Sequence, residues 1–147
     1  MPVKRPKHLL IVGGGVFQVP AIKIAQSMGL KVVVTDYNPE AEGMLLADYP
    51  IEVSTRNINL TVNTAKQFHR TCPLDGVLTV GTDASQTVAA VADALNLPGI
   101  PFEVAERATD KIKMRQVLQE KGVLVPEFRP IWTLEDCRQA INDMPLP

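Results

Sequence analysis

An apolar segment at residues 9–12 runs directly into three consecutive glycines, Gly13, Gly14 and Gly15. A helical pattern follows at once, with apolar residues spaced to cover one face: Phe17, Ala21, Ile24, Ala25 and Met28. Strand, glycine turn and helix typically open a nucleotide- or phosphate-binding α/β domain. Glycine lets the backbone approach a ligand closely, and the helix start offers free N–H groups to an anion. We therefore expect an anion-binding turn here.

The turn matches the dinucleotide-binding fingerprint only in part, because Gln18 stands where a third glycine would allow close packing of helix on strand. Asp36 ends the second predicted strand, residues 32–35, at the place where such proteins contact a ribose hydroxyl. The same residue is equally suited to close the strand as a turn residue. An NAD-dependent oxidoreductase or a dinucleotide-sensing regulatory domain therefore stays open as an alternative, and Asp36 would favour NAD over NADP.

Strand and helix patterns alternate along the rest of the chain, which predicts an α/β fold with three layers and an open, mostly parallel sheet. We expect further strands at residues 50–53, 76–80 and 127–131, and helices at 41–47, 58–71, 85–95, 102–108, 110–121 and 134–142. Thr109 is expected to cap the helix at 110–121, and Gly122 to end it. The stripes at residues 17–28 and 88–95 are expected to be core, and Trp132 to pack with Ile131.

Composition narrows the classes of function. A net charge of −1 over 147 residues argues against nucleic acid as the main partner. No apolar run approaches the ~18–20 residues of a membrane span. The two cysteines, Cys72 and Cys137, are far apart without a CxxC pattern, and the two histidines have no ligand partners at useful spacing. We expect a reduced, cytoplasmic protein with a small-molecule partner and no metal site of its own.

Polar residues also follow the fourth predicted strand, where Thr82 and Asp83 come directly after Gly81. Ligands of open α/β sheets collect at the carboxyl ends of the strands, although these residues could equally begin the following helix. We predict no catalytic residue. The predicted substrate- or anion-binding residues are Gly13, Gly14, Gly15, Val16, Gln18, Asp36, Thr82 and Asp83.

Three stretches together resemble the N-terminal region of ATP-grasp ligases: residues 9–36, 76–99 and 108–128. In the third, Asp110 and Lys111 open a helix, and residues 122–126 lead from a glycine to a proline. The superfamily includes biotin carboxylase, carbamoyl phosphate synthetase, D-alanine ligase and purine-pathway enzymes. The resemblance implies a Rossmann-like pre-ATP-grasp domain over residues 1–107. A linker helix and the truncated start of the ATP-grasp domain would then occupy residues 108–147.

The resemblance also implies a function for a longer parent protein. Such enzymes use ATP and Mg²⁺ to turn a carboxylate into an acyl phosphate, which an amine then attacks. The first domain would bind the carboxylate or amine substrate, and Lys111 would contact ATP. The Mg²⁺ ligands would lie beyond this chain, so the fragment is not expected to catalyse ligation alone. The resemblance allows a homodimer, and a non-catalytic α/β interaction module stays open as a further alternative.

Overall fold

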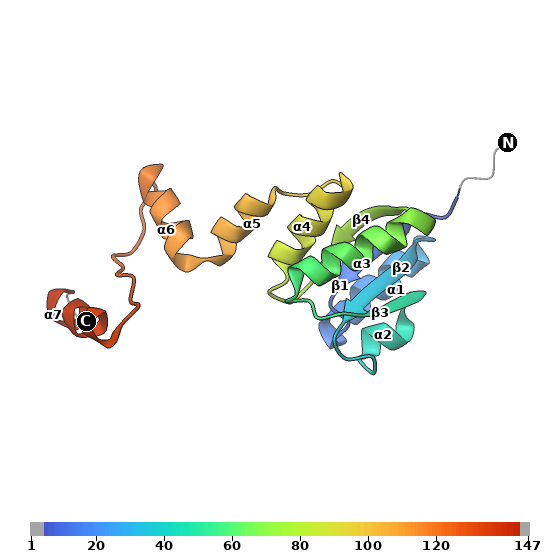
Figure 1. The fold of residues 1–147 in the computed structure, drawn as a ribbon, viewed down its shortest axis with the longest axis horizontal. Coiled ribbons are helices and arrows are strands. Elements are labelled where there is room, and N and C mark those ends of the chain that lie inside the picture. The colour runs from blue at the N-terminus through green and yellow to red at the C-terminus, as the bar shows by residue number, and fades with distance from the viewer. Residues whose placement is uncertain (1–4, 145–147) are drawn as a thin grey trace. The chain divides into compact units, whose positions relative to one another are not determined.

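The computed structural model describes residues 5–144, and its first part is built on one parallel sheet (Figure 1). The strands are β1 (His8–Val12), β2 (Lys31–Asp36), β3 (Tyr49–Glu52) and β4 (Leu74–Leu78), in the spatial order β3-β2-β1-β4. Every neighbouring pair is parallel. All four carboxyl ends therefore meet at one edge of the sheet.

The chain divides into two units, of which the first ends at Thr109 and the second begins at Asp110. The first unit holds a short 3₁₀ helix, η1 (Val16–Gln18), followed by α1 (Val19–Ser27), α2 (Glu42–Leu46), α3 (Ile58–Thr71), α4 (Ser85–Leu95) and α5 (Phe102–Thr109). The second unit holds α6 (Lys111–Glu120) and α7 (Leu134–Asp143). The observed bounds of α3 and α4 equal the predicted ranges.

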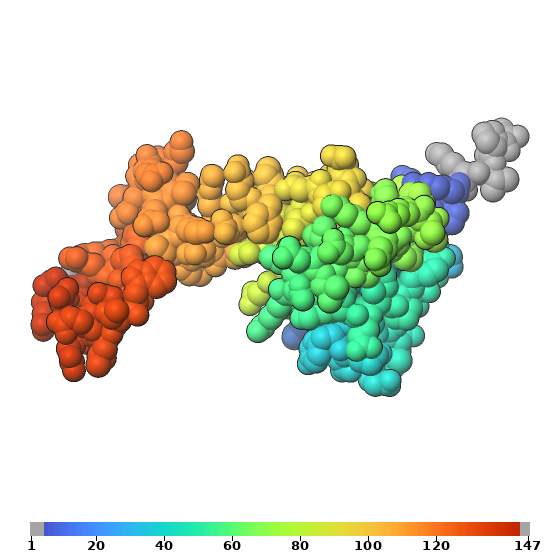
Figure 2. Space-filling view, in the orientation of Figure 1, coloured from blue at the N-terminus to red at the C-terminus, as the bar shows by residue number. Residues whose placement is uncertain are grey.

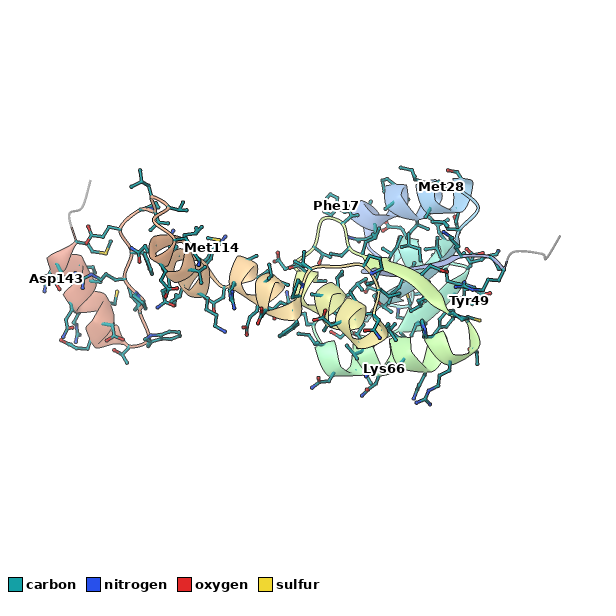
Figure 3. All side chains as sticks on the ribbon, turned by 90° about the horizontal axis from the view of Figure 1, so that it is seen from above. Phe17, Met28, Tyr49, Lys66, Met114 and Asp143 are labelled. Atoms are coloured by element: carbon teal, nitrogen blue, oxygen red, sulfur yellow. The ribbon has the colours of Figure 1, made fainter. Side chains whose placement is uncertain are left out.

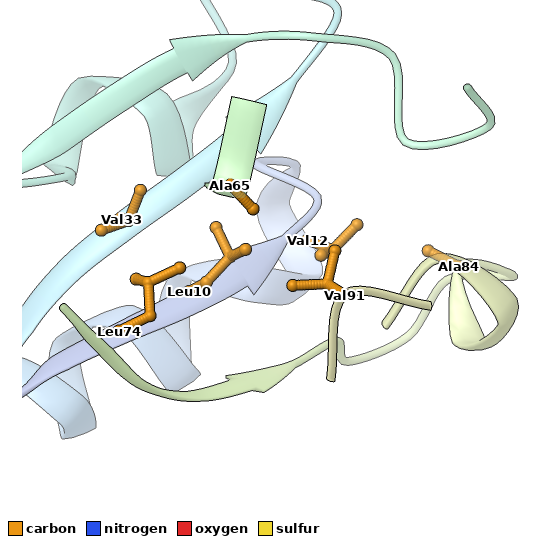
Figure 4. Packing of buried hydrophobic residues seen from close by; sticks show 7 residues of the cluster. All are labelled: Leu10, Val12, Val33, Ala65, Leu74, Ala84 and Val91. Carbon is orange, nitrogen blue, oxygen red and sulfur yellow. The ribbon is translucent and has the colours of Figure 1, made fainter. Parts of the chain in front are cut away.

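Helices cover both faces of the sheet, which confirms the predicted three-layer α/β fold. One face packs on α1 and α2 through a cluster of Ile11, Ile22, Ala25, Val32, Val34 and Met44. The other packs on α3 and α4 through Leu10, Val12, Val33, Ala65, Leu74, Ala84 and Val91 (Figure 4). Side chains of successive strand residues point to opposite faces, so strands covered on both sides are apolar throughout. Figure 2 shows the outer surface of α3 covering the sheet on one side.

The expected core stripe on the first helix is confirmed for Ala21 and Ala25, which belong to or pack against the core cluster, and is wrong for the other three residues. Phe17 and Met28 are each 70% exposed, and Ile24 is also exposed. The face that meets the sheet is centred on Ile22, which was not predicted, and on Ala25, which was; both are buried. In Figure 3, Phe17 and Met28 lie on the side of the first unit that α1 occupies, opposite Lys66 of α3. The expected stripe on α4 is confirmed, since Val91 is buried and its apolar neighbours pack against the same cluster.

The fourth strand lies two residues earlier than predicted. Leu74 pairs with His8, and the ladder ends at Leu78. Beyond that point Thr79 donates its hydroxyl to the Val12 carbonyl oxygen at 2.6 Å, and the Val80 carbonyl accepts from a side chain. At this edge, hydrogen bonds from side chains to backbone carbonyls thus take the place of the hydrogen bonds between strands. The loop that follows leaves the sheet and borders the site.

In the second unit, the expected strand at 127–131 is absent from the described structure. The start of α6 is set by a side-chain cap close by in the sequence. Asp110, and not Thr109, caps α6, because its carboxylate accepts from the N–H groups of Ile112 and Lys113. Thr109 is the last residue of α5 and donates its hydroxyl to the Ala105 carbonyl at 2.9 Å. The expected packing of Trp132 is also wrong, since this side chain is 79% exposed.

Candidate functional site

The carboxyl edge of the sheet contains a topological switch point between β1 and β4. From β1 the chain moves to β2 and β3 on one side, and then returns to β4 on the other side of β1. The connections on the two sides of this point diverge, which leaves a crevice above the strand ends. Ligand sites of open α/β sheets form at such crevices.

A cleft of about 580 Å³ lies at this edge, and we call it the carboxyl-edge cleft. The loops after all four strands contribute to it, as the predicted parallel sheet requires. Its lining consists of Gly13, Gly15, Phe17, Gln18, Asp36, Tyr37, Ser54, Thr55, Arg56, Gly81 and Thr82. Five of the eight predicted binding residues are therefore brought together here, while Gly14, Val16 and Asp83 are not part of the lining.

The first two glycines are needed for the backbone conformation and close packing of the turn. Gly13 adopts a φ of +103°, which a residue with a side chain rarely takes, and its N–H donates to the Thr35 carbonyl at 2.8 Å. Gly14 is buried so tightly that a Cβ atom on it would lie 2.9 Å from Cγ of Met44. Its N–H donates to Oδ2 of Asp36 at 2.8 Å. Neither N–H group is therefore free for a ligand.

The next three residues leave their donors unused. Within residues 5–144, the backbone N–H groups of Gly15, Val16 and Phe17 donate to no group of the protein. They form the start of η1, where helical geometry provides no internal acceptor. Unused N–H groups beside a cleft are suited to binding an anion.

Asp36 acts as a structural partner of the glycine turn. Besides the bond from Gly14, its Oδ1 accepts from the Asn38 N–H at 3.0 Å, which closes the turn after β2. The side chain is half-buried and still borders the cleft. The turn-closing role considered from the sequence is thus present in the structure.

Gln18 connects the loops after β1 and β4. Its side chain is only 4% exposed, and its Nε2 donates to the Val80 carbonyl oxygen. Next to it, Gly81 adopts a φ of +63° with Phe17 packed against it, since a Cβ atom there would lie 3.1 Å from Cβ of Phe17. These contacts fix the loop that carries Thr82 beside the glycine turn.

The segment after β3 was not predicted as part of a site, yet its residues Ser54, Thr55 and Arg56 line the cleft. Arg56 is exposed, and the structure places no carboxylate of the described residues in an ion pair with its guanidinium. Thr87 and Thr61 anchor this segment by donating their hydroxyls to the carbonyls of Thr55 (2.6 Å) and Ser54 (3.2 Å). Only their position in the sequence could have indicated a role in the site, because these residues directly follow a predicted parallel strand.

A profile of the family described as the ATP-grasp N-terminal domain matches residues 22–99. The chain belongs to this family. The match confirms the resemblance inferred from the sequence, and the parallel sheet with helices on both faces agrees with it.

Solved structures of ATP-grasp proteins have the same fold. Phosphoribosylglycinamide synthetase from Anaerococcus prevotii superposes with a TM-score of 0.74 at 26% identity, covering 97% of this chain and 36% of that chain. L-amino acid ligase from Bacillus licheniformis gives 0.72 at 29% identity, covering 91% and 35%. N5-carboxyaminoimidazole synthetase from Staphylococcus aureus, solved with ADP, gives 0.73 at 21% identity, covering 95% and 36%. The chain spans about a third of the length of each.

Asp83 and Lys111 do not line the cleft of this ATP-grasp N-terminal domain, and neither do Gly14 and Val16. Asp83 is exposed, and it does not cap α4, whose N-cap is Ala84 without a side-chain bond. Lys111 is the first residue of α6 in the second unit and is exposed. One turn further along, the guanidinium of Arg115 lies 5.4 Å from the ring centre of Phe128. That residue is thus engaged within its own unit.

Residues 5–144 contain no group of three or more histidine, cysteine, aspartate or glutamate side chains placed to hold a metal ion. None of the helices described for this ATP-grasp N-terminal domain is long and apolar enough to cross a membrane.

Proposed function

We propose that this chain forms the acceptor-binding front part of an ATP-dependent ligase that joins a carboxylate to an amine through an acyl phosphate. The observation that carries the proposal is the carboxyl-edge cleft, which Gly15, Phe17 and Arg56 line together. The backbone N–H groups of Gly15 and Phe17 donate to no group of the described residues. Hydroxyl groups of Ser54, Thr55 and Thr82 add further donors. The cleft therefore favours a ligand with a carboxylate or phosphate group.

The charges of the cleft support an anionic ligand. Asp36 borders the cleft, but its carboxylate accepts two backbone N–H groups, and this partly satisfies its negative charge. Arg56 has no such partner among the described residues, so its positive charge is available to a ligand. A guanidinium can bind a carboxylate or phosphate through two parallel hydrogen bonds, and such charge-assisted bonds are among the strongest in proteins.

Ligases of this family form the acyl phosphate when a carboxylate oxygen bonds to the γ-phosphorus of ATP and the bond to ADP breaks. An amine then bonds to the carbonyl carbon and phosphate leaves. The contribution proposed for this chain is to hold the acceptor substrate in place, which removes an entropic part of the barrier. Lys111 is proposed to contact the ATP phosphates. The Mg²⁺ ligands are proposed to lie in other parts of the parent protein.

The test uses the longest polypeptide that the gene encodes, with ADP release measured against a panel of carboxylates and amines. Arg56→Gln should raise KM for the acceptor by about 10- to 100-fold, because a charge-assisted bond is lost, and should change KM for ATP less than threefold. Arg70→Gln is the matched control, since Arg70 lies in the last turn of α3, at its other end. ADP release that needs no acceptor, or an Arg56→Gln effect confined to ATP, would refute the proposal.

A further inference from the structure

Two aromatic side chains line the carboxyl-edge cleft although the fold does not bury them. Phe17 is 70% exposed and Tyr37 is 73% exposed, and both border the cleft. Among the other aromatic side chains of residues 5–144, only Trp132 is exposed to a similar degree, and it belongs to the second unit. Neither cleft ring contacts another ring of the described residues. An aromatic ring left in water gains none of the free energy that its burial provides, so both rings are available to a ligand.

The backbone that carries each ring is held in place. Phe17 packs against the loop after β4, since a Cβ atom on Gly81 would lie 3.1 Å from its Cβ atom and 3.5 Å from its Cγ atom. Tyr37 stands between Asp36 and Asn38, whose turn is closed by the bond from the Asn38 N–H to Oδ1 of Asp36 at 3.0 Å. The two side chains follow β1 and β2, which are neighbours in the sheet. The rings are therefore positioned at adjacent strand ends.

The positive charge of the same cleft comes from the next strand end. Arg56 follows β3, which pairs with β2, so its loop neighbours the loop of Tyr37. No carboxylate of the described residues forms an ion pair with its guanidinium. A ligand lying along this edge would meet a cation after β3 and aromatic rings after β2 and β1. A guanidinium binds a carboxylate, and an aromatic ring binds another apolar ring, so the cleft suits a molecule that contains both groups.

We propose that Phe17 and Tyr37 form a ring-binding subsite, and that the acceptor is a carboxylate that carries an apolar ring. The subsite rests on the acceptor-binding function proposed above and adds the chemical class of the acceptor. A cleft that recognised the charge alone would bind a small carboxylate as tightly as a ring-bearing one. Preference for the ring is therefore the property that distinguishes the subsite from simple charge binding.

The test titrates the 147-residue chain with phenylacetate and, separately, with acetate, and follows the backbone amide NMR signals of Tyr37 and Arg56. Phenylacetate should bind about tenfold more tightly than acetate. Phe17→Ala and Tyr37→Ala should each reduce this preference to about threefold, and the double variant should abolish it. Because both rings are largely exposed, these substitutions should leave the chain folded.

Two control variants separate the rings from other effects. Met28→Ala removes an apolar side chain that is as exposed as that of Phe17 but does not line the cleft. Tyr37→Phe keeps the ring and removes only the hydroxyl group. Both controls should retain the preference of about tenfold.

Several outcomes would overturn the inference. Equal affinities of the unmodified chain for the two carboxylates would do so without any variant. An unchanged preference in the double variant, or a lost preference in Tyr37→Phe or Met28→Ala, would also do so. If neither carboxylate shifts the amide signals, the ring-binding subsite is likewise overturned. In each case the acceptor dependence of ADP release judges the proposed ligase function separately.

Discussion

Gly43→Ala tests how the glycine turn is held in place. Gly43 lies in α2, and its N–H donates to the Gly14 carbonyl oxygen at 2.6 Å. A Cβ atom on Gly43 would stand 2.6 Å from that oxygen and 2.8 Å from Cδ1 of Ile22. The nearest obstacle is backbone, which cannot move aside as the end of a flexible side chain can. The substitution should therefore displace α2 from the glycine turn.

Two opposing effects set the magnitude. In an unobstructed helix, replacing glycine with alanine stabilises by about 1 kcal/mol. Overpacking a closely packed site costs about 1–3 kcal/mol, and loss of the bond to Gly14 adds about 1 kcal/mol. We expect the steric and hydrogen-bond losses to win, with a net destabilisation of about 1–3 kcal/mol. The amide signals of the neighbouring Gly15 and Val16 should shift as well.

Urea unfolding followed by far-ultraviolet circular dichroism measures this change. With a denaturant dependence of about 1–3 kcal/mol/M, the midpoint should fall by roughly 1 M. Gly76→Ala is the control, because a Cβ atom there would meet only Cδ1 of Leu9, at 3.3 Å, the end of a flexible side chain. An unchanged or higher midpoint for Gly43→Ala would refute the close backbone contact between α2 and the glycine turn.

Three further predictions concern charge, nucleotide binding and the division of the chain. The bonds from Arg5 lower the pKa of Asp75, so its stabilising contribution is present above the unfolded pKa of about 3.9 and is lost as pH falls from there through the lowered pKa of the folded state. In urea unfolding, Asp75→Asn should modestly destabilise the chain at pH 7 and destabilise it less at pH 2.5, and an equal loss at both pH values would contradict this. In the longest encoded polypeptide, Lys111→Ala should weaken ATP binding about tenfold, as measured by calorimetry. Replacing the exposed Lys66 with alanine is the control and should leave ATP affinity unchanged. If Lys111→Ala binds ATP as tightly as the unmodified protein, Lys111 is not part of the ATP site. A chain ending at Thr109 should unfold with a urea midpoint close to that of the full chain, because no residue of either core cluster, or packed against it, comes after Leu97. A midpoint lower by 1 M or more would contradict this prediction.

Much of the first unit was predictable because its signals are local. The apolar spacing that defines α3 and α4 ends at breaking residues, so their bounds could be read from short windows. The helix after the glycine turn was harder, since apolar residues occur on more than one face. Only the packing partner decides that Ile22 faces the sheet while Phe17 and Met28 do not. Pattern alone cannot supply that choice.

The site was predictable to the extent that it follows from strand ends. Gly13, Gly15, Asp36 and Thr82 were expected at the carboxyl edge and do border the cleft. Arg56 belongs to no motif, and only the rule that parallel strand ends meet could have pointed to it. The bond between Gln18 and Val80 joins residues 62 positions apart, and no pattern around either residue indicates it.

The second unit shows most clearly the difference between structure that local interactions determine and structure that needs a distant partner. Its two helices form where capping is local: Asp110 caps α6, and Thr133 and Asp136 make reciprocal bonds that open α7. The expected strand at 127–131 has the right residue types, but a strand requires a partner for its backbone, and none of the described residues pairs with it. Of the residues described after Asp110, Ala140 alone is buried, so this unit has almost no core of its own. Its sequence therefore specifies helices it can complete alone, together with apolar side chains such as Trp132 and Leu124 whose burial requires further protein surface.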